Sequence, residues 1–380
     1  MIYLDHAATS WPKPPAVIEA MARTMEAEGG NAGRSSHRLA ERAAERIFEC
    51  RAALAELFHV SNPLRISFTA NATEALNLAL KGLLQPGDHA VCTGMEHNSV
   101  WRPLVGLQGR GVSFTIAPAE ADGRVVPARI IQALRPETRL MVVPHASNVN
   151  GAVNRVKEIG RLARERNVLF LVDASQTAGS MPIDVETMQI DLLAFPGHKG
   201  LLGPQGTGGL YVREPLLLAP LKEGGTGSSS NSAFPPDYVP DRYESGTLNT
   251  PGIAGLQAGV QHLLGQGVKE IQSGEWQLTQ QLLQGLAAIP RVTLYGPAGD
   301  IPRAPVVSFN VEGKDPVEVA EELDRLYHVA SRPGLHCAYL AHQTQGTEKI
   351  GTLRLSLGYC TTEREIAEVL QAVRLIAESA

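Results

Sequence analysis

Residues 171–200 read LVDASQTAGSMPIDVETMQIDLLAFPGHKG, and this stretch decides the fold prediction. An apolar run ends at Asp173, and a second run, DLLAF at 191–195, leads into Gly197-His198-Lys199-Gly200. Short apolar runs of this kind are typical of buried strands in a parallel sheet. The carboxyl ends of such strands border one crevice, so groups distant in sequence can meet there. We therefore expect Asp173 and Lys199 at the same edge of a sheet.

Asp173 and Lys199 together form the pair that pyridoxal phosphate (PLP) chemistry requires. A carboxylate keeps the pyridine nitrogen protonated, and a lysine amine forms a Schiff base with the aldehyde carbon. Either residue alone has an ordinary explanation, because acids often follow parallel strands and most lysines are solvated. A lysine after Gly197 and His198, between a strand and a Gly/Pro-rich loop, is not ordinary surface composition. The sequence thus predicts a PLP site at these two residues.

Bulk properties narrow the class of protein. The chain has 380 residues, 43% apolar and 19% charged, with a net charge of -5, which predicts a folded protein of one large and one smaller domain. The charge gives no reason to expect nucleic-acid binding, no apolar run reaches transmembrane length, and no signal peptide is evident, so a cytoplasmic protein is expected. The cysteines lie far apart without a CxxC pair, which predicts free thiols and no zinc ribbon: Cys50, Cys92, Cys337 and Cys360.

Strand and helix patterns alternate over the first two thirds of the chain, which predicts an α/β fold with a mainly parallel sheet. The strand candidates are residues 65–69, 89–93, 112–116, 139–144, 168–173, 191–195 and 208–212, with helices at 15–28, 38–58, 155–167 and near 252–265. Residues 222–240 read as a long Gly/Ser/Pro-rich loop. Beyond about residue 262 the pattern becomes α+β, with strands near 305–311 and 352–357. We predict a large domain of residues 15–261, and a small domain formed by 262–380 with residues 1–14 as an N-terminal arm.

Several polar residues follow the predicted strands. Ala72 and Thr73 open a helix after the strand RISFT, where free amides and the hydroxyl suit a phosphate, although a simple helix cap would look the same. His97 follows the strand HAVCT and could lie on a cofactor ring and exchange protons, or be merely structural. Asn148 and Gln176 could offer amides to the phenolic oxygen of the cofactor.

The segment Ser331-Arg-Pro-Gly-Leu-His-Cys-Ala338 is the second specific cluster. A free cysteine is usually a small buried hydrophobe. Cys337 instead sits in a Gly/Pro loop with Arg332 and His336 nearby, where exposure and positive charge would favour a thiolate. A metal site of His336, Cys337 and His342 matches no common zinc spacing, so none is predicted. Arg354, a single charge in TLRLSLG, is either a solvated edge residue or a clamp for a substrate carboxylate.

These motifs resemble the class V aminotransferase superfamily, PLP enzymes of fold type I, and within it the cysteine desulfurases. The resemblance spans nearly the whole chain, through YLDHAAT, NATEALN, MEHNS, SNVNG, DASQ, GHKG, ESGTLNT, RPGLHCA and GTLRLSLGY. The last two blocks are most similar to group II, the SufS-like and selenocysteine lyase-like members. The implied fold has a large PLP domain with a mainly parallel seven-stranded sheet and a smaller α+β domain.

The resemblance also implies a role for each matching residue. Lys199 would carry PLP, Asp173 would pair with its pyridine nitrogen, and His97 would stack on its ring. The remaining implied contacts are Ala72, Thr73 and His198 with the phosphate, Asn148 and Gln176 with the phenolic oxygen, Thr247 with the phosphate of a neighbouring subunit, and Arg354, Asn148, Arg332 and His37 with the substrate. Thr247 thus implies a homodimer. Two positions depart from the family pattern, Pro196 where a hydroxyl residue is usual and Leu335 where a histidine is common.

The function we predict is conversion of L-cysteine to L-alanine, with the sulfur left as a persulfide on Cys337 for an acceptor protein. The resemblance connects such enzymes with iron–sulfur cluster assembly. One alternative is a selenocysteine lyase or another PLP lyase or transaminase, in which Cys337 is incidental. Another is a sulfur-relay protein that mainly docks an acceptor and has weak catalysis of its own.

Overall fold

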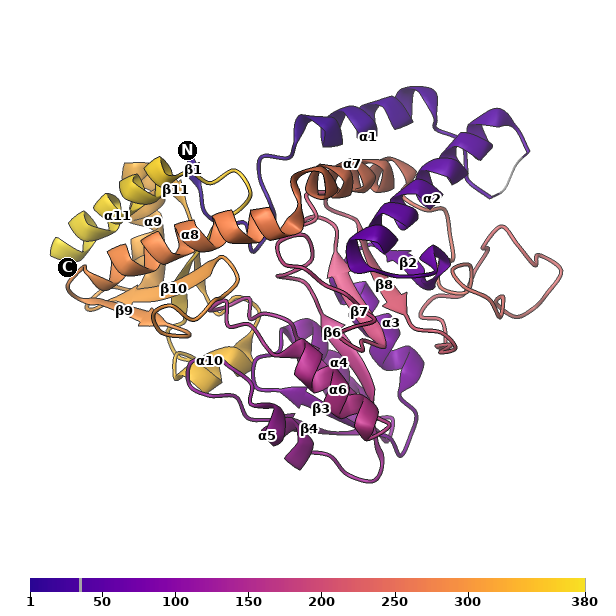
Figure 1. The fold of residues 1–380 in the computed structure, drawn as a ribbon, viewed down its shortest axis with the longest axis horizontal. Helices are drawn as coiled ribbons and strands as arrows, with labels where there is room; N and C mark the ends of the chain where they lie inside the picture. Colours follow the sequence, from indigo (N-terminus) through magenta and orange to yellow (C-terminus); the bar gives the residue numbers. More distant parts are fainter. Residues whose placement is uncertain (34–35, 380) are drawn as a thin grey trace.

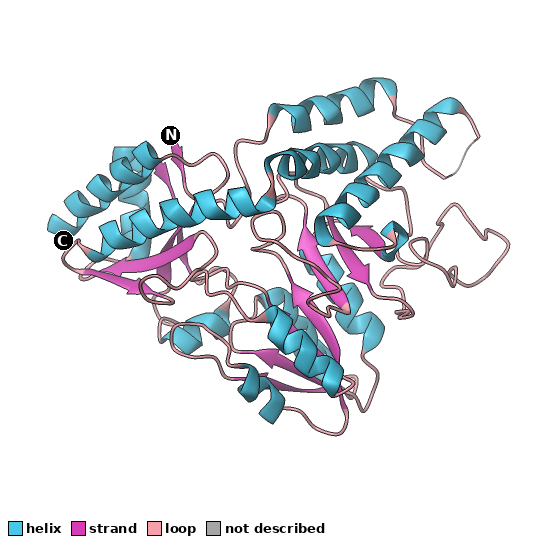
Figure 2. Ribbon diagram, viewed as in Figure 1, coloured by secondary structure: helices cyan, strands magenta, loops and turns pink. Residues whose placement is uncertain are grey.

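The computed structural model describes residues 1–33 and 36–379, and within them the chain forms a large and a small sheet, each with its own helices (Figures 1 and 2). The large sheet has seven strands in the order β2-β8-β7-β6-β5-β3-β4. Their bounds are Ile66–Thr69 (β2), His89–Thr93 (β3), Ser113–Ala117 (β4), Thr138–Pro144 (β5), Leu169–Asp173 (β6), Leu192–Pro196 (β7) and Gly208–Val212 (β8). Only β8 runs antiparallel to its neighbours in this sheet. The predicted mainly parallel sheet is confirmed, and each predicted strand lies within one residue of its observed bounds.

Helices cover both faces of the large sheet, which explains why its strands read as continuous apolar runs. The helices are α1 (Pro15–Ala27), α2 (Arg38–Phe58), α3 (Ala72–Leu83), α4 (Asn98–Gln108), α5 (Pro127–Gln132), α6 (Val156–Glu165) and α7 (Thr250–Gln266), with a short 3₁₀ turn at Pro63–Arg65. Side chains alternate along β6, so Phe170 and Val172 join the core under α2, α6 and α7, whereas Leu171 joins the core under α3 and α4. Among the described residues, no helix is long and apolar enough to cross a membrane.

The small sheet is antiparallel and has the order β12-β13-β10-β9. Its strands are Val292–Tyr295 (β9), Val306–Val311 (β10), Arg332–Gly334 (β12) and Thr352–Ser356 (β13), and its surroundings include α8 (Val268–Ala287), α9 (Pro316–Tyr327), α10 (Tyr339–Gln345) and α11 (Glu363–Glu378). The N-terminal strand β1 (Ile2–Tyr3) pairs with β11 (Val329–Ala330), so the two ends of the chain lie in the same region (Figure 1).

The connection between the two sheets passes through α7 and the long helix α8 (Figure 1). Gly267 separates these helices with a φ of 87°, a conformation that glycine adopts without strain. The boundary predicted between residues 261 and 262 falls inside α7, which ends at Gln266. The division into two domains stays a prediction.

Two local expectations change in the structure. The segment predicted as a loop around Cys337 begins as a strand, because Arg332–Gly334 pair with β13. Arg354 lies on β13, which is flanked by β12 and β10, and it is buried. The alternative that Arg354 is a solvated edge residue is therefore wrong. The predicted long loop is present, and residues 213–249 contain neither helix nor strand.

Candidate active site

A cavity at the carboxyl ends of β5, β6 and β7 collects most of the predicted cofactor residues. The predicted residues that line it are Ala72, Thr73, His97, Asn148, Asp173, Gln176, His198 and Lys199. They lie at the ends of different strands or in the segments that follow them, as expected where parallel strands end at one edge. Pro196, the last residue of β7, also lines the cavity and offers no backbone N–H to a ligand.

Asp173 and Lys199 share this cavity and differ in how they are held. Asp173 is the last residue of β6 and is buried, and its Oδ1 accepts a hydrogen bond of 2.9 Å from the Ser175 amide. Lys199 lies in the turn after β7, where its carbonyl accepts from the Ser10 hydroxyl at 2.9 Å. Burial, and then the Arg354 charge, lower the pKa of Lys199 to about 8, with Asp173 opposing the shift. A buried amine with a lowered pKa is suited to react with a carbonyl carbon.

One end of the cavity is built to receive an anion. Asn71 caps α3, and its Oδ1 accepts from the Glu74 amide at 2.9 Å. The amides of Ala72 and Thr73 lie in the first helical turn, where a helix supplies no partner of its own. His198 also lines the cavity, and its Nδ1 lies 3.1 Å from the Thr9 hydroxyl. Burial lowers the pKa of His198 to about 4, so this histidine is neutral near pH 7.

His97 presents a neutral ring to the same cavity. It caps α4, and its Nδ1 accepts from the Ser99 amide at 3.1 Å. Burial, followed by the charge of Lys199, lowers the pKa of His97 to about 4. Because Nδ1 accepts, the proton of the neutral ring is on Nε2. His97 can therefore stack on an aromatic ligand and still donate one hydrogen bond.

The two side-chain amides predicted to contact the cofactor each donate a hydrogen bond to a backbone carbonyl. Asn148 Nδ2 donates to the His336 carbonyl at 2.8 Å, and Gln176 Nε2 donates to the Ala7 carbonyl at 3.2 Å. Each amide nitrogen carries two protons, so one donor of each remains for a ligand. Asn148 in addition connects the cavity with the segment that carries Cys337.

Arg354 is almost completely buried, with 2% of its side chain exposed. Its Nη2 donates to Asp5 Oδ1 and its Nη1 to the Asn148 carbonyl, both at 2.9 Å. The buried Nε has no hydrogen-bond partner among the described residues. A buried cationic donor without a partner is costly, so this atom marks a place for an anionic ligand. Arg332 lies opposite Arg354 in the sheet and approaches Asp5 at 3.9 Å.

Asp5 is the residue of this cluster that the sequence prediction missed. It lies 349 positions from Arg354, and nothing in its local sequence indicates a partner at that distance. Its carboxylate faces both arginines and orients Arg354. The signal available was a single acidic residue in an apolar N-terminal segment, which is too common to be diagnostic.

Cys337 is exposed at a groove that adjoins the cofactor cavity. The groove and the cavity share Thr73 and His97, and the Cys337 carbonyl accepts from the Asn98 amide at 2.8 Å. Cys50 and Cys92 are buried. The expectation that His336 adds positive charge beside the thiol is wrong, because His336 is buried and its pKa is lowered to about 3, first of all by that burial.

Thr247 and His37 lie away from this cavity. Both are exposed, and neither is among the residues that line the cavity. His37 caps α2 with its Nδ1, and Thr247 Oγ1 accepts from Asn31 Nδ2 at 3.5 Å. Within one chain, then, the structure does not bring these two predicted residues to Lys199. Leu335, the position where a histidine was the family expectation, is 38% exposed.

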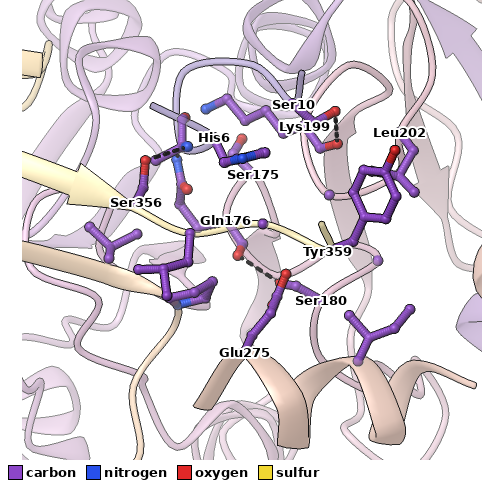
Figure 3. Close-up of a pocket in the computed structure, with 18 of the residues that line it drawn as sticks. His6, Ser10, Ser175, Gln176, Ser180, Lys199, Leu202, Glu275, Ser356 and Tyr359 are labelled. Carbon is purple, nitrogen blue, oxygen red and sulfur yellow. Dashed lines mark hydrogen bonds between the residues drawn. The ribbon is translucent and has the colours of Figure 1, made fainter. Parts of the chain in front are cut away.

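A second cavity also borders Lys199 (Figure 3). Ser175, Gln176 and Lys199 line both cavities, and Glu275 on α8 lines the far part of the second one. Glu275 is buried, and its Oε2 has no hydrogen-bond partner in the part of the chain that the structure describes. Burial alone raises the pKa of Glu275 to about 8.

Comparison with known proteins agrees with this geometry. The profile of the aminotransferase class-V family matches residues 2–369. A probable cysteine desulfurase of Methanothermobacter thermautotrophicus is 36% identical over 99% of this chain and 94% of its own length. A cysteine desulfurase of Pectobacterium atrosepticum is 33% identical over 99% of this chain and 93% of its own.

Solved structures lead to the same group of proteins. The apo cysteine desulfurase of Thermococcus onnurineus superimposes with a TM-score of 0.92 at 32% identity, covering 100% of this chain and 95% of the other. The cysteine desulfurase CsdA of Escherichia coli gives a TM-score of 0.89 at 28% identity, over 99% and 94% of the two chains. The chain therefore belongs to the class-V aminotransferase family and, within it, to the cysteine desulfurases.

Proposed function

We propose that this protein uses pyridoxal phosphate to convert L-cysteine to L-alanine and keeps the sulfur as a persulfide on Cys337. The observation that carries the proposal is the arrangement of three groups. Lys199 and Asp173 line one cavity, and the exposed Cys337 lies at a groove that shares Thr73 and His97 with it. A protein with a reactive thiol would then take the sulfur from Cys337.

The donors and acceptors of the cavity fit the cofactor. Bound there, pyridoxal phosphate supplies an electron sink for the carbon from which Lys199 removes a proton. Asp173 would hold the proton of the ring nitrogen, and His97 would cover the ring. Ala72, Thr73 and His198 would bind the phosphate, while Asn148 and Gln176 would face the phenolic oxygen.

Residues of the small sheet hold the substrate, and Cys337, in the segment that follows β12, attacks it. Arg354 binds the carboxylate through its unpartnered Nε, with Arg332 adjacent on β12. The thiolate of Cys337 attacks the substrate sulfur, so that an S–S bond forms as the Cβ–S bond breaks. The electron pair left on Cβ takes a proton, Lys199 returns a proton to Cα, and alanine is released. His37 stays a predicted lining residue of the substrate pocket.

Product analysis tests this function. L-cysteine, selenocysteine and cysteine sulfinate are supplied in turn to the wild type, to Cys337→Ser and to Cys360→Ser, which alters the other exposed cysteine. We expect alanine from cysteine with the wild type and Cys360→Ser and none with Cys337→Ser. Alanine from cysteine in Cys337→Ser would show that the thiol is incidental, as in a selenocysteine lyase or transaminase. Weak turnover that rises strongly with an added acceptor would favour a sulfur-relay role.

A homodimer is part of the proposal. Thr247 is exposed and distant from its own cavity, so it can reach the phosphate of a neighbouring subunit across a two-fold axis. Helices α1 and α2 expose large apolar side chains, among them Ile18, Met25 and Phe48, which such an interface would cover. Light scattering should give a dimer, and Thr247→Ala should weaken cofactor binding. An active monomer loaded with cofactor would refute the dimer.

A further inference from the structure

Two histidines behind Cys337 form a buried hydrogen-bond chain that the proposed chemistry does not use. His336 Nε2 lies 2.9 Å from the Arg332 carbonyl, and His336 Nδ1 lies 3.2 Å from His342 Nε2. His342 Nδ1 lies 2.7 Å from the Thr347 hydroxyl. The two imidazole rings are stacked with centroids 5.3 Å apart, and His336, His342 and Thr347 are all buried.

The chain admits one arrangement of protons when both rings are neutral. The Arg332 carbonyl can only accept, so His336 carries its proton on Nε2 and accepts on Nδ1. His342 must then donate from Nε2 and accept on Nδ1, which makes the Thr347 hydroxyl the final donor. Each member therefore fixes the tautomer of the next.

Burial, aided by the charge of Arg354, keeps the pair neutral, and Glu348 opposes this at His342. The groups that act on it are Arg332 on β12, Arg354 on β13 and Glu348, which follows α10. Burial, and then Arg354, lower the pKa of His336 to about 3 and that of His342 to about 4. In this arrangement the two ring nitrogens without a proton, His336 Nδ1 and His342 Nδ1, each already accept a hydrogen bond. The chain is thus intact throughout the neutral pH range.

The backbone beside this chain is strained and needs external support. His336 and Cys337 are consecutive non-glycine residues in the left-handed region, with φ of 49° and 55°. Such conformations persist when the surroundings hold them in place. Asn148 Nδ2, in the loop after β5, holds the His336 carbonyl, and the Asn98 amide at the start of α4 holds the Cys337 carbonyl. The Arg332 carbonyl on β12 and His342 on α10 hold the His336 side chain.

We propose that His342 is a positioning residue for the step in which Cys337 accepts sulfur. Through His336 it fixes the backbone of Cys337, so that the thiol stays at the groove beside His97. His336 accordingly acts on Cys337 through the backbone, because its two ring nitrogens are occupied by Arg332 and His342. The inference rests on the proposed function and deepens it by assigning a residue that does not touch substrate or cofactor.

Paired substitutions in the full-length protein loaded with cofactor test the proposal. Thr347→Val removes the terminal donor at nearly constant volume, and Thr347→Ser keeps it. His342→Leu removes the donor to His336, and His342→Gln retains an amide N–H in its place. Three readouts are compared: deuterium exchange of the peptide covering residues 332–341, the binding constant for L-cysteine from the cofactor absorption, and the single-turnover rate of sulfur transfer to Cys337 by mass spectrometry.

We expect Thr347→Val and His342→Leu to speed exchange in this peptide and to slow sulfur transfer at least tenfold, with the cysteine binding constant within about twofold of wild type. Thr347→Ser and His342→Gln should restore most of the rate. Wild-type exchange and transfer in Thr347→Val would overturn the proposal, and this isosteric variant decides the case if His342→Leu does not fold. Equal losses in binding and transfer would also overturn it, since they indicate a general structural role. If the wild type itself forms no persulfide, the proposed function fails, and exchange still reports on the hydrogen-bond chain.

Discussion

The proposed cofactor residues and the proposed nucleophile of this protein are positioned by different means. Asp173 ends a buried strand and Lys199 follows another, so the ladder of the large sheet sets their places. Cys337 has a left-handed backbone and depends on Asn148, the Asn98 amide and the His336–His342 pair. A position that the backbone hydrogen bonds of a sheet fix should change little when nearby side chains are substituted. A segment held by single side chains should move when one of them is substituted. Substitutions can therefore separate cofactor loading from sulfur transfer.

The largest effect is expected for substitution of Lys199. Lys199→Ala should abolish both the visible absorption of bound cofactor and all turnover, because Lys199 supplies the covalent attachment and moves the Cα proton. Absorption spectra of the purified variant measure the first effect, and product analysis the second. Lys157→Ala, an exposed lysine on α6, serves as the control and should behave as wild type. An unchanged spectrum in Lys199→Ala would remove Lys199 from the cofactor site.

The second largest effect is expected at Arg354. Arg354→Ala should raise KM for cysteine by roughly 10- to 100-fold, since a hydrogen bond to a charged group is worth about 1.5–3 kcal/mol. The visible band should persist, because Arg354 does not hold the cofactor. Arg354→Lys, which keeps the charge and loses the Nε donor, should be intermediate. Steady-state kinetics decide the matter, and a KM within about twofold of wild type in Arg354→Ala would exclude a direct clamp.

The smallest effect is expected at Glu275, which lines the second cavity together with Lys199 (Figure 3). Its pKa is about 8 in the folded chain, against roughly 4.3 in an unfolded one. Between these values the unfolded chain has released a proton that the folded chain retains, so stability falls as pH rises through this window. Glu275→Gln removes this effect and should raise Tm by on the order of a few degrees at pH ~7.5, with little change at pH ~4.

Thermal unfolding at both pH values measures the effect of Glu275→Gln. Glu363→Gln, at an exposed glutamate in the first turn of α11, is the matched control. A Tm of Glu275→Gln equal to that of the wild type at pH ~7.5 as well as at pH ~4 would mean that the Glu275 carboxyl is not the buried, protonated group described above.

The sequence predicted the cofactor end better than the cysteine end. The end of a buried parallel strand can be recognised in a sequence, because the strand is an apolar run and the polar residue at or after its end interrupts it, as with Asp173 and Lys199. The contact between Asp5 and Arg354 joins residues 349 positions apart, and no local pattern encodes it. The neutrality of His336 depends on burial by other segments, so the part of the expected positive charge that His336 was to supply was wrong. Only Gly267 separates helices α7 and α8, so no turn-rich segment marks the end of α7 in the sequence. The predicted domain boundary therefore fell inside α7.

The central claim is that sulfur passes from cysteine to Cys337. The direct measurement is mass spectrometry of the cofactor-loaded wild type after brief exposure to L-cysteine without a reductant, with the peptides of Cys50, Cys92, Cys337 and Cys360 mapped separately. We predict one added sulfur atom on Cys337, formed at the rate at which alanine appears. Cys360 is the internal control for non-specific sulfuration, because it is also exposed. A sulfur adduct confined to another cysteine, or alanine formed with Cys337 unmodified, would contradict the account.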